Sequence, residues 1–467
     1  MLSYRKLAMR VLGRPLHTEG IDSPRPASQR AAAFALTAAM LITLAAPAFA
    51  KTWHIEDGDI TVKAGDTKGT NKVSQGESTD VPDTDTVITN REKNASSNTV
   101  TIETNDKNDK VEVTLKDVNI DTSSRNKAAV SVTGEGDTNI KLDGDNALKS
   151  DIYRSGIYGS GSGSLTISGG ENDSLTAQGG SGANGISSSG SLTISGGTVT
   201  ANGDDGGRGI SSSGSVTISG GSTVTANGGN GTISGGDGIC SNGGVTISGG
   251  STVTANGGNG GSLVGGDGIR SGGGLTVSDG TVTAKGGNGD SKDGYGGDGI
   301  RSGGVITISG NTVNAAGGYG GKVGGYGICS FDRVAISGGT VEAAGGNGST
   351  GGGSGIYSSV IDLSGSLELT AKAGSPNGKA LLQAGHELDL DTIKDKLGPG
   401  AKVTVTDADG KVNQVSIPRP VEPEEPVIPE ESSSSSDGGS ATPSTPVSPR
   451  PGLTITDNSR PVSPYAS

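Results

Sequence analysis

Apolar residues alternate with polar ones in short runs along the middle of the chain, and glycine-rich segments separate these runs. Alternation with a period of two over three or four residues predicts short β-strands, and none of the runs has a helical period. Strands this short bury too little surface to be stable alone. They therefore need neighbouring strands that repeat the same pattern.

Three strings recur in a fixed order along the chain. The first is G-I-x-S, with its isoleucines at Ile157, Ile186, Ile210, Ile239, Ile269, Ile300, Ile328 and Ile356. The second is V/L-T-I-S, centred on Ile167, Ile194, Ile218, Ile247, Val277, Ile308 and Ile336. The third is T-V-T-A or a relative, centred on Leu175, Val199, Val224, Val253, Val282, Val313 and Val341. A period of 24 to 31 residues indicates stacked structural units.

Stacking these units in register predicts an all-β fold, a three-sided parallel β-helix of about ten coils. Equivalent Ile and Val side chains then point inward as ladders, and the strands pair along the axis at about 4.8 Å. By analogy with other parallel crossovers, we expect a right-handed helix. Leu115, Leu142 and Ile167, spaced by 27 and 25 residues, extend the pattern upstream.

The repeat divides the chain into five predicted regions. These are an export signal over 1–50, an N-terminal cap over 51–97, the β-helix over 98–385, a C-terminal cap over 386–417 and a disordered tail over 418–467. The C-terminal cap is predicted to be a short helix over 391–398 followed by a hairpin over 403–417. The tail is rich in Pro, Ser and Glu and has too few apolar residues to pack.

The first 50 residues have the composition of a signal peptide. Basic residues precede an apolar run over 31–46, and Ala48-Phe49-Ala50 fits a small-x-small cleavage site. Cleavage after Ala50 predicts a secreted, extracellular protein, and an uncleaved membrane anchor is the alternative. No later segment of the sequence is apolar enough to cross a membrane.

Composition and charge narrow the possible partners. Only 30% of the residues are hydrophobic and 86 are glycine, which suits the thin core of a solenoid. Residues 1–50 hold six basic and two acidic residues, so the remainder has 30 basic and 47 acidic residues and a net charge of −17. This charge argues against nucleic acid as a partner. The histidines have no catalytic or zinc-binding spacing, so we predict no enzyme activity.

The residue after each G-I isoleucine points outward if the isoleucine points inward. This outward column contains Arg270 and Arg301 in consecutive coils, and Cys240 and Cys329 three coils apart. Three strand spacings are about 14 Å, which is too far for a disulfide. We therefore expect two free thiols.

A second column, three residues earlier in each coil, contains Asp237, Asp267 and Asp298. Like charges stacked this closely need neutralising. Either the arginines and aspartates neutralise one another, or the aspartates bind calcium while Arg270 and Arg301 bind uronate carboxylates. Three loop tyrosines are candidates to offer flat faces to sugar rings: Tyr295, Tyr319 and Tyr326.

Two strings ahead of the regular repeat carry a family resemblance. Residues 111–120 read V-E-V-T-L-K-D-V-N-I and residues 143–148 read D-G-D-N-A-L, followed by repeated G-G-D-G-I and L-T-I-S-G-G. Residues 98–375 thereby resemble a bacterial family of carbohydrate-binding right-handed parallel β-helix domains with a pectate-lyase-like fold. The resemblance implies non-catalytic binding of plant-wall glycans, acidic pectin-type chains among them, with calcium.

These observations favour a secreted protein that binds an acidic, uronate-containing polysaccharide with calcium. One alternative is a surface adhesin or matrix protein that binds host or cell partners. A second alternative is a polysaccharide lyase, because the same fold supports lyases that use arginine and aspartate–calcium clusters. Neither the glycan nor the oligomeric state follows from the sequence.

Overall fold

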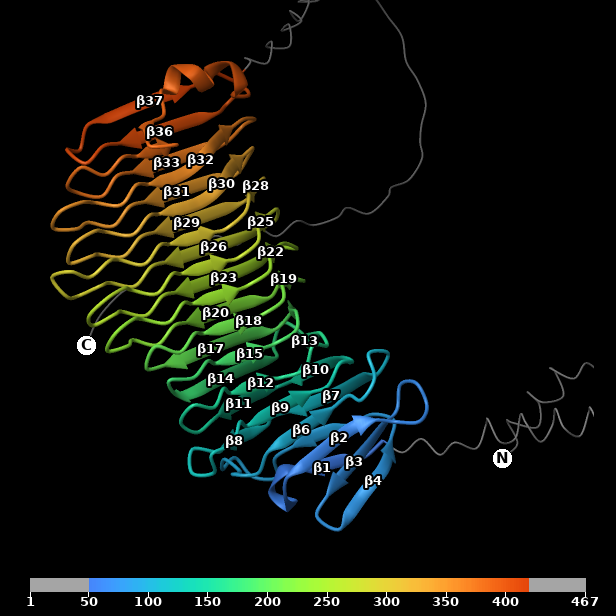
Figure 1. Ribbon diagram of the computed structural model, residues 1–467. Helices are drawn as coiled ribbons and strands as arrows, with labels where there is room; N and C mark the ends of the chain where they lie inside the picture. The colour runs from blue at the N-terminus through green and yellow to red at the C-terminus, as the bar shows by residue number, and fades with distance from the viewer. Residues whose placement is uncertain (1–49, 420–467) are drawn as a thin grey trace, which may run out of the picture. The chain divides into compact units, whose positions relative to one another are not determined.

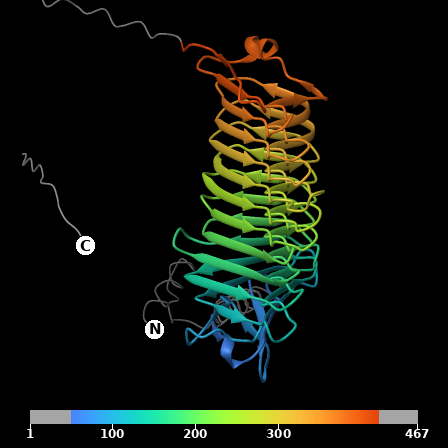
Figure 2. The same cartoon turned by 90° about the vertical axis from the view of Figure 1, so that its left-hand side faces the viewer.

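The computed structural model describes residues 50–419, so the predicted signal peptide and nearly all of the predicted tail lie outside the described residues. The described chain is an all-β solenoid of about 11 turns (Figures 1 and 2). In the regular part each coil contributes three strands, as in β15 (Ile186–Ser188), β16 (Leu192–Ser195) and β17 (Thr198–Asp204). The predicted fold class is confirmed, with about one turn more than expected.

The three recurring strings form three columns of parallel strands. The G-I-x-S column comprises β2 (Ile60–Ala64), β6 (Val100–Glu103), β9 (Val130–Thr133), β12 (Ile157–Gly159), β15, β18 (Ile210–Ser212), β21 (Ile239–Ser241), β24 (Ile269–Ser271), β27 (Ile300–Ser302), the start of β30 (Ile328–Ile336) and of β32 (Ile356–Leu363), and β34 (Leu381–Gln383).

The V/L-T-I-S column comprises β1 (Thr52–His54), β5 (Val87–Thr89), β7 (Lys110–Lys116), β10 (Asp137–Asp143), β13 (Leu165–Ser168), β16, β19 (Val216–Ser219), β22 (Val245–Ile247), β25 (Leu275–Val277), β28 (Ile306–Ile308) and the ends of β30 and β32.

The third column is a separate 12-stranded sheet. It comprises β8 (Asn119–Asp121), β11 (Asp145–Lys149), β14 (Ser174–Ser181), β17, β20 (Thr223–Asn227), β23 (Ser251–Asn256), β26 (Gly280–Lys285), β29 (Thr312–Ala316), β31 (Thr340–Ala344), β33 (Glu368–Lys372), β36 (Lys402–Thr406) and β37 (Val412–Ser416).

In the regular coils the register is the one predicted from the repeat. Upstream the prediction was wrong by two residues, because Ile167 pairs with Ile140 and not with Leu142. Ile210 pairs with Ile239, which pairs with Ile269, and all three are fully buried. Equivalent residues from successive coils therefore stack on one another and fill a thin core. Burying apolar side chains contributes about 25 cal/mol per Å², and each short strand gains this only because the coils on both sides cover it.

The loops between the third column and the next G-I strand also stack. Isolated parallel bridges join Gly231, Gly260, Gly289, Gly320 and Gly348 from one loop to the next. A Cβ atom on Gly266 would lie 1.9 Å from the carbonyl oxygen of Gly236, so only glycine allows this approach. Loop packing therefore explains the G-G strings without any role in chemistry.

Parallel pairing begins earlier than the boundary at residue 98 that we predicted. Strand β1 pairs with β5 and β2 pairs with β6, so 52–103 already form solenoid coils. An antiparallel arm of β3 (Asn71–Gln75) and β4 (Ser78–Asp83) is inserted after β2. This insertion interrupts the repeat in the sequence, although Trp53, Ile60 and Ile88 join the same core.

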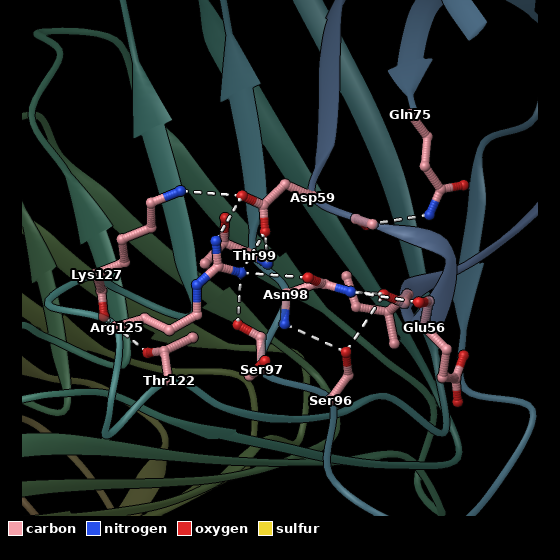
Figure 3. A network of polar contacts seen from close by, with 12 residues as sticks. Glu56, Asp59, Gln75, Ser96, Ser97, Asn98, Thr99, Thr122, Arg125 and Lys127 are labelled. Carbon is pink, nitrogen blue, oxygen red and sulfur yellow. Dashed lines mark hydrogen bonds and ion pairs between the residues drawn. The ribbon is translucent and has the colours of Figure 1, made fainter. Parts of the chain in front are cut away.

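An ion network fastens the first coils to one another (Figure 3). The carboxylate of Asp59 accepts hydrogen bonds from Arg125 Nη1 at 2.8 Å and Lys127 Nζ at 2.9 Å, and from the backbone N–H of Thr99 at 2.9 Å. Burial opposes ionisation of Asp59, but these three donors lower its pKa to about 2. The network links β2 to a loop two coils away.

The C-terminal end agrees with the predicted cap. A 3-10 helix, η2 (Leu390–Lys396), replaces the helix expected over 391–398, and β36 and β37 form the expected antiparallel hairpin. A short strand, β35 (His386–Glu387), pairs antiparallel with β34. Another short 3-10 helix, η1 (Ile55–Asp57), follows β1. Within the described residues, no helix is both long and apolar enough to span a membrane.

Candidate functional site: an arginine cleft on the middle coils

The three predicted aspartates form a buried ladder. Asp237, Asp267 and Asp298 are each at most 6% exposed. Asp237 Oδ1 accepts the backbone N–H of Asp267 at 2.9 Å, and Asp267 Oδ1 accepts that of Asp298 at 2.8 Å. Asp298 Oδ1 accepts the N–H of Tyr326 at 2.7 Å. One oxygen of each carboxylate is therefore bonded to the next coil.

Arginines hold the second oxygens of the two outer aspartates. Arg208 Nε lies 3.2 Å from Asp237 Oδ2, in the next coil. Arg301 Nη1 lies 3.3 Å from Asp298 Oδ2, in the same coil. Of the two arginines predicted to neutralise the aspartates, only Arg301 forms an ion pair, and it does so within its own coil; the other pair comes from Arg208, which was not predicted.

Arg270 and Asp267, in the coil between, take part in no ion pair within the described residues. The backbone of Arg270 pairs directly with that of Arg301 on one side and of Cys240 on the other. Arg208 extends from its own coil, where Nη1 lies 3.5 Å from Ser211 Oγ, toward the coil of Cys240, where Nε contacts Asp237. The three arginines therefore follow one another along the axis, in which coils are about 4.8 Å apart.

These side chains line one open surface cleft of about 500 Å³, which we call the arginine cleft. Its charged lining residues are Arg208, Asp237, Asp267, Arg270 and Arg301. Glycines of the stacked loops form most of the remaining wall, so backbone groups are accessible there. Four of the predicted site residues therefore meet in one place.

A second cleft of similar volume lies beside the N-terminal arm, and its charges differ. Its lining includes two lysines and three acidic residues: Lys68, Lys110, Asp85, Glu112 and Asp137. Acidic groups outnumber basic ones here, whereas basic groups outnumber acidic ones in the arginine cleft. Of these two clefts, the arginine cleft is the one whose charge suits an anionic ligand. A smaller neighbouring cleft of about 230 Å³ is lined by Arg154 and no acidic residue.

Burial dominates the electrostatics of the aspartate ladder. Burial, followed by the neighbouring carboxylates of Asp298 and Asp237, raises the pKa of Asp267 to about 8. Burial also raises the pKa of Asp298, but less, because Arg301 and the N–H of Tyr326 favour its ionised form. Asp267 therefore holds a proton more strongly than Asp298 does.

The aspartates are poorly arranged for calcium. Calcium takes six to eight oxygen ligands, mostly from exposed or convergent carboxylates and carbonyls. Here one oxygen of each aspartate already accepts a backbone N–H, and two of the others face arginine. Within residues 50–419, no group of three or more His, Cys, Asp or Glu side chains is placed to hold a metal ion.

The predicted tyrosines are separated. Tyr295 and Tyr319 are exposed on the stacked loops, and Lys322 Nζ lies 5.7 Å from the ring centre of Tyr295. Tyr326 instead stacks on Tyr357, with ring centres 5.1 Å apart, so one of its faces is covered. None of the three predicted tyrosines lines the arginine cleft.

Both thiols are free, as predicted, but they are buried and not exposed. Cys240 lies in the outward column, beneath Arg208 and beside Asp237, and burial raises its pKa to about 11. Burial likewise raises the pKa of Cys329 to about 12. An outward direction in the column therefore did not mean exposure.

Two contributing residues were not among the predicted site residues. Arg208 occupies an aspartate position of the repeat, and only its long side chain carries its charge into the next coil. Phe331 is exposed, and Arg301 Cζ lies 5.0 Å from its ring centre. Both extend the row of arginine and aromatic side chains along the solenoid axis.

No family model matches this chain, and no curated protein or solved structure matches it either. The arrangement of the site therefore carries the functional argument alone.

Proposed function

We propose that this chain binds an acidic polysaccharide, without catalysis, through the arginine cleft, after export from the cell. The single observation that carries the proposal is Arg270. It is an exposed arginine on the floor of an open cleft and has no ion pair within the described residues. An arginine fork binds carboxylates in a bidentate manner, which makes a uronate a suitable ligand.

The order of the arginines favours a polymer over a small anion. Arg208, Arg270 and Arg301 repeat at the spacing of the coils, so a chain lying along the axis meets a cation in each coil. Arg208 and Arg301 are partly committed to aspartates, and Arg270 is free for a ligand. Exposed Tyr295, on the adjoining loops, adds an aromatic surface for sugar rings.

In this proposal the aspartates orient the arginines, and calcium is not required. Asp237 and Asp298 each bond both a backbone N–H and an arginine, so they hold the guanidinium groups in place. The family resemblance implies calcium, so the test below compares binding with calcium and with a chelator. Binding that depends strictly on calcium would contradict the arginine-based account.

One further observation favours the alternative of a protein-binding adhesin. The stacked loops expose a group of apolar and aromatic side chains: Ile233, Leu263, Val264, Tyr295 and Tyr319. Exposed apolar groups of this kind mark protein interaction surfaces. A protein ligand would contact these loop tips and would not need Arg270.

The test is retention of residues 51–467 on immobilised polygalacturonate and on an uncharged polysaccharide, with calcium and with a chelator. We expect retention on polygalacturonate only, in both conditions, and weakening with salt because the attraction is ionic. Absorbance of unsaturated products is followed in the same samples, and a rise would favour the lyase alternative. Equal retention on both polymers, or on neither, would reject the proposal.

A further inference from the structure

The aspartate ladder contains carboxylates where amides would serve the fold equally well. Two coils before Asp237 the same position is Asn184, whose Oδ1 accepts the backbone N–H of Arg208 at 2.8 Å. The adjacent loops use asparagine for the same bond, since Asn230 Oδ1 accepts the N–H of Asn259 at 2.7 Å. Burying an ionisable carboxyl costs more than burying a neutral amide. The hydrogen-bonding role alone does not explain three aspartates.

The second oxygen of each aspartate shows what the carboxylates add. In Asp237 and Asp298 this oxygen faces an arginine. In Asp267, the middle one, it has no hydrogen bond or ion pair within the described residues, and Asp267 lines the arginine cleft together with Arg270. The middle carboxyl is thus the one whose charge is not committed to a partner.

We propose that protonation of Asp267 controls the affinity of the arginine cleft for polyanions. This inference rests on the proposed function. With Asp267 neutral, three arginines face two carboxylates, which leaves one positive charge for a ligand. With Asp267 ionised, the charges of the cleft balance, and Arg270 acquires a competing carboxylate inside the protein.

Asp237 and Asp298 flank Asp267, and the positive charge of Arg301 acts on it. Burial raises the pKa of Asp298 to about 6, so this neighbour loses its proton at a lower pH than Asp267 does. Cys240, Cys329 and Tyr326 are also close, and burial raises the pKa of each. These three groups therefore stay neutral across the range in which Asp267, with its pKa of about 8, loses its proton.

The sign of the coupling follows from linkage. Because a polyanion favours the neutral form of Asp267, bound ligand raises the pKa of Asp267, and binding near pH 8 takes up protons. Polyuronate carboxylates are ionised throughout pH 6–10, so the ligand itself does not titrate. We expect the affinity of the native chain for polygalacturonate to fall about tenfold between pH 6 and pH 10, since one unit charge a few Å from the ligand is lost.

The experiment measures polygalacturonate affinity and proton uptake by titration calorimetry, at pH 6 and pH 10 and in two buffers of different ionisation enthalpy near pH 8. Asp267→Asn keeps the oxygen that accepts the N–H of Asp298, and we expect it to lose much less affinity than the native chain between the two pH values and to take up no proton near pH 8. The remaining loss comes from Asp298, whose pKa is raised to about 6. Asp293→Asn, an exposed loop aspartate outside the arginine cleft, is the matched control and should behave like the native chain. Thermal unfolding of all three proteins verifies that they are folded.

The outcomes separate the two proposals. If the native chain fails to bind at pH 6, the polysaccharide function is rejected, and the coupling is rejected with it. If it binds equally at pH 6 and pH 10, the polysaccharide function stands and the coupling is overturned. If Asp267→Asn loses affinity at high pH as strongly as the native chain does, the pH dependence arises elsewhere and Asp267 is not its source.

Discussion

Asp59 and Asp267 each accept a hydrogen bond from a backbone N–H of another coil, yet their surroundings shift the pKa values of the two carboxyls in opposite directions. Asp59 lies at the N-terminal end, where Arg125 and Lys127 both contact it, and its pKa falls to about 2. Asp267 lies in the middle coils between two other carboxylates, without an ion pair of its own, and its pKa rises to about 8. The N-terminal carboxylate therefore stabilises the fold, whereas the central one lowers its stability near neutral pH.

The difference reflects the regularity of the two regions. In the middle coils the exact repeat places identical residues next to one another in successive coils. The three aspartates therefore stack at the strand spacing of about 4.8 Å. At the N-terminal end the repeat is degenerate, and side chains of opposite charge from three segments meet (Figure 3). Exact repetition builds the apolar core of this solenoid, whereas the favourable network around Asp59 forms where the repeat is degenerate.

The largest expected effect is on stability at Asp267. Its folded pKa lies above the unfolded value, so its favourable contribution is complete below about pH 4 and is lost as pH rises to about 8. The native chain should lose up to about 1.4 kcal/mol per pH unit across this window. Asp267→Asn should remove most of the slope between about pH 6 and pH 8 and raise the melting temperature at pH 8, whereas Asp298, whose pKa is raised to about 6, still contributes at lower pH. An unchanged pH profile of thermal unfolding would contradict the raised pKa.

Asp59 should show the opposite dependence. Its folded pKa lies below the unfolded value, so its contribution is complete above about pH 4 and is lost as pH falls toward 2. Asp59→Asn should destabilise the N-terminal coils by about 1–2 kcal/mol at pH 7, because two cations lose their partner and the site is partly screened by water. Hydrogen exchange of the amides in β2 and β6 measures this loss locally.

Asp57→Asn is the matched control for Asp59. Asp57 pairs only with Arg91, and both side chains are nearly half exposed. Surface pairs of this kind contribute little to stability, because water screens the two charges. If Asp57→Asn proved as costly as Asp59→Asn, the Asp59 network would have no special role in fastening the first coils.

A smaller effect tests the core where the repeat is irregular. Thr138 stands between Val111 and Leu165 in an inward ladder, fully buried, and its hydroxyl has no partner within the described residues. Thr138→Val should raise the free energy of unfolding by about 1 kcal/mol, because it removes an unsatisfied buried hydroxyl. Thr122, equally buried, donates its hydroxyl to the carbonyl of Lys127 at 2.7 Å, so Thr122→Val should have the opposite sign.

The sequence alone predicted the register of the middle coils, but it did not predict which of their outward-pointing residues are buried. The Ile and Val ladders follow from the strings alone, because a slip of one residue would turn every apolar side chain outward. The arm of β3 and β4 concealed the true start of the solenoid, since an insertion breaks the period without ending the core. Burial of Asp267 and Cys240 depends on stacked loops and on side chains from other coils, and no local pattern encodes it.

The candidate site was predicted in part, because the spacing shows which residues stack but not where long side chains end. Arg270, Arg301 and the three aspartates are found from their columns, because equal spacing places them side by side. Arg208 was missed as a cleft residue since its guanidinium group lies between its own coil, where it contacts Ser211, and the next coil, where it contacts Asp237. The predicted ligand-binding role of the three tyrosines was too broad. Their spacing placed them on one edge of the solenoid, but their rings do not lie in one cleft.

The most direct test of the central claim compares the polygalacturonate affinity of Arg270→Ala with that of Arg333→Ala at pH 6. Both native side chains are exposed arginines on the outer surface, but only Arg270 lines the arginine cleft. We predict at least a tenfold loss for Arg270→Ala, the scale of one charge-assisted bidentate contact, and no change for Arg333→Ala. Equal affinity of the two variants would contradict the account.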